Sequence, residues 1–297
     1  MSITSQEIES QPSCWRLAAQ AGTPSIDTDR AIQAPEVGQR VAVVGCGTSW
    51  FIAQSYAALR ESAGLGETDA FAASEFGWGR AYDHIVAISR SGTTTEILRL
   101  LERWGDGAAT TAITAVADSP VSSLAAETVA LDFADEHSVV QTRFATSALA
   151  YLRATIGDPL ESAIAQAQEA LAQPLPVQVD AFDHFVFLGH GWTNGLASEA
   201  ALKMREAAQA HTESYPAMEY RHGPISLAGR RSLVWVLGTP DDGVADDVRA
   251  TGATVLQAER DPMAELIMIQ RAAVHLAEVR GLNPDSPRNL TRSVVLS

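Results

Sequence analysis

Cysteine is scarce in this chain, with two among 297 residues. Cys14 and Cys46 lie far apart and belong to no Cys-x-x-Cys motif or Cys/His cluster. This spacing argues against a disulfide framework and against a structural zinc site. We therefore expect no disulfide and no metal, and we predict a reducing, cytoplasmic setting.

Basic residues and long apolar runs are also few. Lys and Arg total 21 against 36 Asp and Glu, which gives a formal net charge of −15. Such a charge repels DNA, RNA and anionic membrane surfaces, so we expect no nucleic-acid partner and no membrane partner. The sequence has no stretch of about 18 apolar residues, and its first residues lack the basic and apolar regions of a signal peptide. The 46% hydrophobic content is enough for a large core.

The chain does contain an alternation of strand-like and helix-like segments. Short apolar runs are each followed by a loop and then by a helix-like stretch. Because parallel strands need crossover connections, this alternation predicts an α/β fold with doubly wound parallel sheets. The predicted strands are 40–45, 84–89, 184–189 and 232–237, and the helices that follow the first three are 50–61, 96–104 and 196–210.

The strand–loop–helix pattern is written twice. Gly45-Cys46-Gly47-Thr48 in the first half corresponds to Gly189-His190-Gly191-Trp192 in the second. We interpret this as an internal duplication of two flavodoxin-like α-β-α halves. A Pro-containing break at 173–176 marks the joint. The predicted domains are therefore 1–172, with an N-terminal helical segment, and 173–297, with a C-terminal tail.

A hydroxyl-rich loop, Ser89-Arg90-Ser91-Gly92-Thr93-Thr94-Thr95, follows the predicted strand at 84–89. Backbone N–H groups at a helix start can join such side chains around an anion, for example a sugar phosphate. Ser and Thr at this place are equally common as helix caps, so the spacing leaves both interpretations open. A nucleotide site is disfavoured, because the loops carry neither a full G-x-G-x-x-G nor a Gly-Lys-Thr motif.

Glu199, Lys203 and Glu206 recur one turn apart on the predicted helix at 196–210. Such spacing alone is typical of a solvated, salt-bridged helix. The surrounding stretch EAALKMREAAQAHTESYPAMEYRHGP, however, resembles the second half of the SIS (sugar isomerase) domain of glutamine:fructose-6-phosphate aminotransferases, the glucosamine-6-phosphate synthases. That family has an E-x-A-L-K-x-K-E helix, an H-x-E-x-Y segment and then E-x-x-H-G-P.

Further segments resemble the same family in the same order along the chain. Residues 45–49 are similar to its C-G-T-S loop, and residues 89–92 to its S-Q-S-G loop. Residues 136–143 resemble its E-x-x-V-A-S-T-K segment, and residues 287–294 resemble its P-R-N-L-x-x-S-V tail. The resemblance covers nearly the whole chain and implies two SIS subdomains.

The resemblance also implies which residues bind a phosphosugar. Arg90 replaces the family's glutamine and is expected to add positive charge beside the phosphate. Val139 and Gln141 are expected to line the sugar. The implied phosphate-binding residues are Ser89, Ser91 and Thr94, with Thr48 and Ser49 nearby.

The catalytic roles implied by the resemblance fall on four residues. Glu206 matches the glutamate that moves a proton between C1 and C2 of the sugar, which needs a carboxylate within hydrogen-bond reach. Glu199 and Lys203 match residues that support it and contact the sugar hydroxyls. His222 matches a ring-opening histidine that the neighbouring subunit contributes, so the resemblance implies a homodimer.

Arg292 departs from the family, because it stands where the family has an imine-forming lysine. A guanidinium stays protonated and cannot act as the amine of an imine. Arg292 could instead hold a phosphate or a carboxylate, or line the closed site electrostatically. The chain also enters the isomerase-like part directly after Met1-Ser2, without the family's N-terminal cysteine, so we expect no glutaminase activity.

These observations predict a phosphosugar enzyme that needs no cofactor. The favoured activity is that of an amino-sugar-phosphate deaminase/isomerase, which converts a glucosamine 6-phosphate-like substrate to a ketose 6-phosphate. The alternatives are a plain aldose–ketose isomerase and a non-catalytic phosphosugar-sensing module. Retention of Glu206 and His222 favours an enzyme, since a pure binder needs no proton shuttle. Strong acidity counts against a DNA-linked sensor.

Overall fold

The computed structural model describes residues 1–23, 34–105, 107–239 and 243–296. Two sheets form its framework, with strand orders β2-β1-β3-β4-β5 and β7-β6-β8-β9. Every strand pair in them is parallel, so the predicted α/β class with parallel sheets is confirmed. The strands are β1 Val41–Gly45, β2 Thr68–Ala72, β3 His84–Ile88, β4 Ala109–Thr114, β5 Glu127–Ala130, β6 His184–Gly189, β7 His211–Pro216, β8 Ser232–Val236 and β9 Thr254–Gln257.

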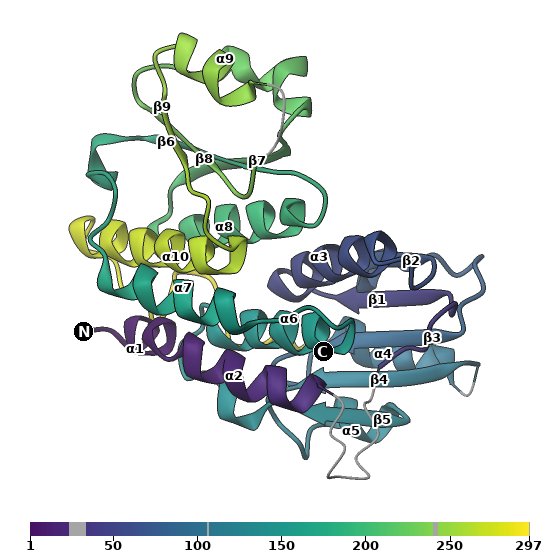
Figure 1. The fold of residues 1–297 in the computed structure, drawn as a ribbon. Helices are drawn as coiled ribbons and strands as arrows, with labels where there is room; N and C mark the ends of the chain where they lie inside the picture. The colour runs from purple at the N-terminus through teal and green to yellow at the C-terminus, as the bar shows by residue number, and fades with distance from the viewer. Residues whose placement is uncertain (24–33, 106, 240–242, 297) are drawn as a thin grey trace. The chain divides into compact units, whose positions relative to one another are not determined.

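Helices cover both faces of the first sheet (Figure 1). The strand residues Ala42, Val44 and Ala87 pack on one face with Ile97 and Leu100 of α4. The opposite face of β1 and β3 is also fully buried, and α3 contacts both β1 and α6 there. Burial on both faces explains why these strands read as continuous apolar runs. The helices of this part are α3 Thr48–Ser62, α4 Thr95–Trp104, α5 Pro120–Leu124 and α6 Arg143–Thr155.

The second sheet is covered in the same way. One face packs Val186, Leu188 and Val234 against Val244 and Val248 of α9. The other face meets α8 and α10, and the indole N–H of Trp235 in β8 donates to Glu265 Oε1 of α10 at 2.5 Å. The helices of this part are α7 Glu161–Ala172, α8 Thr193–Ala208, α9 Val244–Ala250 and α10 Pro262–Val279. Short 3-10 turns lie at η1 Ala73–Glu75, η2 Asp132–Ala134, η3 Val179–Ala181, η4 Glu219–His222 and η5 Pro224–Leu227.

Two pairs of glycines carry the internal duplication into the backbone. A Cβ on Gly45 would lie 2.4 Å from the carbonyl carbon of Ser49, and a Cβ on Gly189 would lie 2.4 Å from the carbonyl oxygen of Thr193. Gly47 and Gly191 both have φ 54°, a left-handed conformation that favours glycine. The two loops therefore make the same turn for the same steric reason, and the shared strand order fits the predicted duplication.

The chain forms two compact units that interleave along the sequence. The first unit contains 1–12, 137–140 and 162–290, and the second contains 13–136, 141–161 and 291–297. The N-terminal residues thus group with the second sheet, and the last residues group with the first sheet. The predicted division into domains 1–172 and 173–297 differs from these units and stays a prediction.

The start of the chain is bound to the first unit by one carboxylate. Asp285 accepts hydrogen bonds from the N–H of Thr4 at 2.8 Å, from the Thr4 hydroxyl at 2.7 Å and from the N–H of Ile3 at 3.0 Å. Partial burial opposes ionisation of this carboxyl, but the hydrogen bonds outweigh it and lower the pKa of Asp285. These bonds hold α1 Ile3–Glu9, after which α2 Gln11–Gly22 begins. In the described ranges, no helix is both long and apolar enough to cross a bilayer.

Candidate functional site

The predicted phosphate-binding residues gather at one edge of the first sheet. β1 and β3 pair in parallel, so their carboxyl ends lie side by side, and the strand order reverses between them. In doubly wound sheets this switch point is where ligands bind. Thr48 and Ser49 begin α3 after β1, and both are buried. The hydroxyl-rich loop follows β3, so the structure brings the two predicted loops together.

The hydroxyl-rich loop is held by its own side chains. Ser91 Oγ accepts from the N–H of Thr93 at 3.2 Å, and Ser89 Oγ lies 3.4 Å from Thr94 Oγ1. Gly92 has φ 65°, and a Cβ there would lie 2.0 Å from Ser119 Oγ. Glycine is therefore required at the bend of this loop. The loop ends at the first turn of α4, where backbone N–H groups lack helical partners.

The Arg90 side chain is bonded to other groups of the chain, so ligand binding is not its sole possible role. Its side chain is 1% exposed, and its Nη1 lies 3.4 Å from Glu136 Oε2, which is fully buried. Its Nη2 donates to the carbonyl oxygen of Arg292 at 2.9 Å. The positive charge that the sequence places in the phosphate loop is therefore shared with a buried carboxylate and with the C-terminal tail.

Glu136 belongs to the motif at 136–143, but no role was predicted for it. Its Oε1 accepts from the N–H of Thr142 at 2.5 Å, from the Thr142 hydroxyl at 2.8 Å and from the N–H of Arg143 at 2.8 Å. It thus satisfies donors at the start of α6 and stabilises the helix dipole there. An acidic residue a few positions before a helix is the pattern from which this role could have been predicted.

Arg292 lies in a specific ion pair. Its guanidinium donates to Asp135 Oδ1 and to the carbonyl oxygen of Glu136. Within the chain, the partner of this side chain is thus a carboxylate, and its predicted role at the substrate stays a prediction. Asp135 was not predicted as a site residue.

A charged ladder lies along α8. Lys203 Nζ is 2.5 Å from Glu206 Oε2 and 3.4 Å from Glu199 Oε1. The Lys203 and Glu199 side chains are 1% and 0% exposed, whereas Glu206 is 19% exposed. A solvated helix face would leave all three in water, so the burial contradicts that interpretation. The ladder holds the Glu206 carboxylate at the surface of α8 on an ammonium group that is fixed in the core.

The Glu206 carboxylate lines a hollow of about 530 Å³ in the first unit. Three cationic or titratable residues of this hollow, Arg205, His211 and Arg288, were not predicted as site residues. Burial lowers the pKa of Arg205, against the opposing effect of Glu206. The E-x-A-L-K-x-K-E, H-x-E and P-R-N-L motifs contain these positions, but their spacing assigns them no chemistry. The lining residues are Leu202, Arg205, Glu206, Gln209, Ala210, His211, Thr212, Arg288, Asn289 and Leu290.

His222 does not join this hollow. It is exposed at the end of η4, beyond the carboxyl end of β7. Glu206 lies at the amino ends of the strands, because α8 runs back from the carboxyl end of β6 and ends just before β7 begins. The six residues of β7 span about 20 Å between these ends. Glu206 and His222 of one chain therefore lie at opposite ends of the strands of the second sheet.

Val139 and Gln141, which were predicted to line the sugar, differ in their bonding. The N–H of Val139 donates to the carbonyl oxygen of Asp285 at 3.0 Å. The Oε1 atom of Gln141 is buried and has no hydrogen-bond partner among the described residues. Buried amide oxygens are nearly always hydrogen-bonded, so an acceptor of this kind is open to a ligand hydroxyl.

Cys46 lies in the loop directly after β1, beside Thr48 and Ser49. Burial, reinforced by the charge of Glu96, raises the pKa of the Cys46 thiol to about 11, so it is a poor nucleophile at neutral pH.

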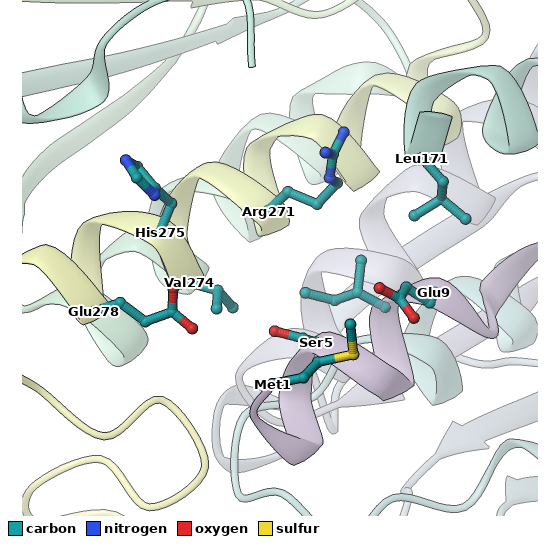
Figure 2. A pocket seen from close by; sticks show the side chains of 9 residues that line it. Met1, Ser5, Glu9, Leu171, Arg271, Val274, His275 and Glu278 are labelled. Carbon is teal, nitrogen blue, oxygen red and sulfur yellow. The ribbon is translucent and has the colours of Figure 1, made fainter. Parts of the chain in front are cut away.

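A second hollow, of about 410 Å³, lies along α1 and α10 and contains none of the predicted site residues (Figure 2). Arg271, one of its lining residues, donates to the carbonyl oxygens of Ala170 and Gln173 at 2.6 and 2.7 Å and thereby caps α7.

Comparison with known proteins independently supports the resemblance to the SIS family. Residues 37–156 match the family described as SIS domain. The glutamine–fructose-6-phosphate aminotransferase of Sulfolobus acidocaldarius is 25% identical over 333 residues, which cover 98% of this chain and 56% of that protein. The chain spans about half the length of the curated relatives it matches.

Solved structures share the fold across nearly the whole chain. Glucosamine-6-phosphate deaminase from Thermotoga maritima superposes with a TM-score of 0.83 at 24% identity, covering 99% of this chain and 100% of the deaminase. Tagatose-6-phosphate ketose/aldose isomerase from Escherichia coli superposes with a TM-score of 0.74 at 18% identity, covering 100% of this chain and 96% of the isomerase. Residues 37–156 thus match the SIS family, which confirms the predicted SIS resemblance, and the solved structures show that the fold is shared over nearly the whole chain.

Proposed function

We propose that this chain is a phosphosugar enzyme, an amino-sugar-phosphate deaminase/isomerase that acts on a glucosamine 6-phosphate-like substrate. One observation carries the proposal. The Glu206 carboxylate is held 2.5 Å from a buried lysine at the wall of a hollow of about 530 Å³. A carboxylate fixed in this way has the position and the charge of a general base.

The proposed substrate contacts are supported by the positions of the two loops after β1 and β3. Ser89, Ser91 and Thr94, with the start of α3 nearby, would bind the phosphate at the switch point of the first sheet. The unpaired Oε1 of Gln141 would accept a hydrogen bond from a sugar hydroxyl. Glu199 would act through Lys203, to which it is paired at 3.4 Å.

The proposed chemistry is a proton transfer followed by hydrolysis. In the open-chain amino aldose, Glu206 removes the proton from C2, and a proton is returned at C1. This sequence moves the carbonyl oxidation level to C2 and leaves an imine there. Water then adds to the imine carbon and the C–N bond breaks, so the products are a ketose phosphate and ammonia. With a hydroxyl in place of the amine at C2, the same proton transfer gives plain aldose–ketose isomerisation.

Arg292 is consistent with a mechanism that forms no imine between the protein and the sugar. Its guanidinium is not nucleophilic and is paired with Asp135. Treatment with borohydride in the presence of substrate should therefore leave the mass of the protein unchanged. A covalent sugar adduct on the amine of Lys203 or on the N-terminal amine would contradict this part of the proposal.

We further propose that the enzyme is a homodimer in which His222 of one protomer serves the Glu206 site of its partner. The opposite placement of the two residues on the second sheet supports this arrangement, because β7 separates them by about 20 Å within one chain. An exposed histidine at the end of a short turn is accessible to a second protomer.

A substrate panel with two product readouts tests the proposal. Purified protein is incubated with hexosamine 6-phosphates, hexose 6-phosphates and glutamine, and ammonia and ketose phosphate are measured separately. We expect both products from a hexosamine 6-phosphate, loss of at least about 100-fold in kcat for Glu206→Gln, and no ammonia from glutamine. Glu169→Gln, on the exposed side of α7, is the matched control and should behave as wild type.

The rival functions give different results in the same experiment. Ketose without ammonia, formed from a hexose 6-phosphate, would identify a plain isomerase. A rise in melting temperature with phosphosugar, without any product and without an effect of Glu206→Gln, would identify a sensing module.

A further inference from the structure

The C-terminal tail lies on the predicted phosphate loop within the second unit. Ser293 Oγ is 3.1 Å from Ser91 Oγ and 2.9 Å from Thr93 Oγ1. At the first turn of α4, the N–H of Thr95 donates to the carbonyl oxygen of Val294 at 3.2 Å. The tail therefore places two oxygen atoms against the hydroxyls of the loop and against a helix N-terminus.

Two arginines hold the tail in this position. Arg292 binds Asp135 and the carbonyl oxygen of Glu136, and Arg90 binds the carbonyl oxygen of Arg292 at 2.9 Å. Beyond the loop, the N–H of Leu296 donates to the Thr95 hydroxyl at 2.9 Å. The tail is thus bound on both sides of Ser293, and the contact of its hydroxyl with Ser91 and Thr93 is part of a continuous set of hydrogen bonds.

The two tail oxygens occupy positions that suit an anion. Hydroxyl groups and the N–H groups of a first helical turn are the donors that proteins use to bind phosphate. Ser293 Oγ and Val294 O meet these donors at hydrogen-bond distance, yet they are neutral acceptors. A phosphate oxygen at the same place would make charge-assisted hydrogen bonds, which are roughly twice as strong.

We infer that Ser293 Oγ and Val294 O occupy the positions that two phosphate oxygens take when substrate binds. The tail therefore competes with the phosphate of the substrate for this loop. The inference rests on the proposed function and adds two groups to the phosphate site, the Thr93 hydroxyl and the Thr95 N–H. It also gives Ser293 a role, because this residue keeps the loop satisfied when no phosphate is bound. Substrate binding then includes displacement of the tail from the loop.

Competition of this kind lowers the apparent affinity for phosphate. The apparent association constant equals the intrinsic constant multiplied by the fraction of molecules in which the tail is detached from the loop. Loss of the Ser293 hydroxyl removes contacts from the seated tail and none from the bound phosphate. Ser293→Ala is therefore expected to bind inorganic phosphate about threefold to tenfold more tightly than wild type.

Calorimetric titration of the full chain with inorganic phosphate, and separately with glucosamine 6-phosphate, tests this. Ser293→Ala should bind both more tightly, and Ser286→Ala, an exposed serine earlier in the same segment, should match wild type. Thr93→Val is added to the Ser293→Ala chain, because this background separates loss of a phosphate ligand from loss of a tail contact. The double variant should bind phosphate more weakly than Ser293→Ala.

Weaker binding by Ser293→Ala would overturn the inference and would make Ser293 a phosphate ligand. Equal binding by the double variant and by Ser293→Ala would remove Thr93 from the site, and absence of phosphate binding in every variant would overturn the whole inference. Hydrogen exchange provides a second measurement. Phosphate should speed exchange at the Leu296 amide, and slower exchange there would show closure instead of displacement.

The two proposals can fail separately. If phosphate competes with the tail while no hexosamine 6-phosphate is converted, the inference stands and the proposed function falls. If a hexosamine 6-phosphate is converted while Ser293→Ala and its Thr93→Val derivative bind phosphate as wild type does, the proposed function stands and the inference falls.

Discussion

At the scale of single residues, Lys203 links the stability of the core to the proposed chemistry. It bridges two carboxylates, and both Lys203 and Glu199 are buried. Lys203→Met should lower the free energy of unfolding by about 3 to 5 kcal/mol, because the Glu199 charge is then left without its lysine partner in the core. Urea denaturation measures this. The double variant Lys203→Met, Glu199→Gln should recover part of the loss, and failure to recover it would show that the two residues do not act as a pair.

The environment of Cys46 makes its thiol less reactive than the residue type alone would predict. It lies in a loop at the sheet switch point, but burial and the nearby Glu96 raise its pKa to about 11. Because a thiol reacts as the thiolate, alkylation of Cys46 by iodoacetamide should be slow at pH 7.5 and should rise as the pH approaches that pKa. Mass spectrometry of the native protein, with urea-unfolded protein and free glutathione as references, follows the reaction. Rapid labelling of native Cys46 at pH 7.5 would contradict the buried environment.

At the scale of elements, the two strand–helix turns depend on paired glycines. Ala at Gly45 or at Gly189 would place its Cβ 2.4 Å from backbone atoms of the following helix. Each of Gly45→Ala and Gly189→Ala should therefore cost about 1 to 3 kcal/mol of stability, as overpacking of a close contact does. Thermal or urea denaturation measures the loss. Gly79→Ala, where a Cβ meets nothing within 4 Å, is the control and should change little. A neutral effect at either turn would mean that the helix can shift away.

The attachment of α1 should depend on pH through Asp285. Hydrogen bonds from Thr4 and Ile3 lower the pKa of this carboxyl in the folded protein. A depressed pKa contributes stability above the unfolded value of about 3.9, and this contribution is lost as the pH falls through the folded value. The difference in unfolding free energy between wild type and Asp285→Asn should thus be constant from pH 6 to 8 and should shrink below about pH 4. A difference that grows in acid would contradict the assignment.

At the scale of the whole molecule, the proposed site shared between two protomers predicts complementation between inactive variants. Glu206→Gln and His222→Ala should each be inactive as homodimers. In a hybrid of the two, one site receives both intact residues and the other receives neither. A mixture that is unfolded and refolded together should therefore regain about a quarter of the wild-type activity. Activity assays before and after co-refolding measure this. No recovery would place His222 and Glu206 in separate sites or remove His222 from catalysis.

Much of the fold could be predicted from the sequence because its causes are local. Strands 184–189 and 84–88 have apolar residues on both faces, and such runs specify buried parallel strands wherever they occur. The glycines of the two strand–helix turns have no alternative that fits their φ angles and close contacts. Helix boundaries shifted by two or three residues, as in α8, because caps and side chains decide where a helix begins.

The candidate site was predicted less completely, since its parts meet only through tertiary structure. Motifs pointed to Glu199, Lys203 and Glu206, but not to their burial, which distinguishes a fixed ladder from a solvated helix face. The hydroxyl loop was predicted, whereas its contact with Ser293, about 200 residues away, was not. Asp135 and Glu136 had no pattern that predicted a pairing with two arginines.

The sequence by itself therefore determined the parallel α/β architecture and its duplication, and it supplied the residues of the proposed phosphosugar site, because periodicity, glycine sterics and motif spacing act over a few residues. Only the tertiary structure decided that Arg292 pairs with Asp135, that Glu206 and His222 lie at opposite ends of the strands of a sheet, and that the tail contacts the hydroxyl-rich loop. Those facts depend on distances between segments that are far apart in the chain, and local sequence does not encode such distances.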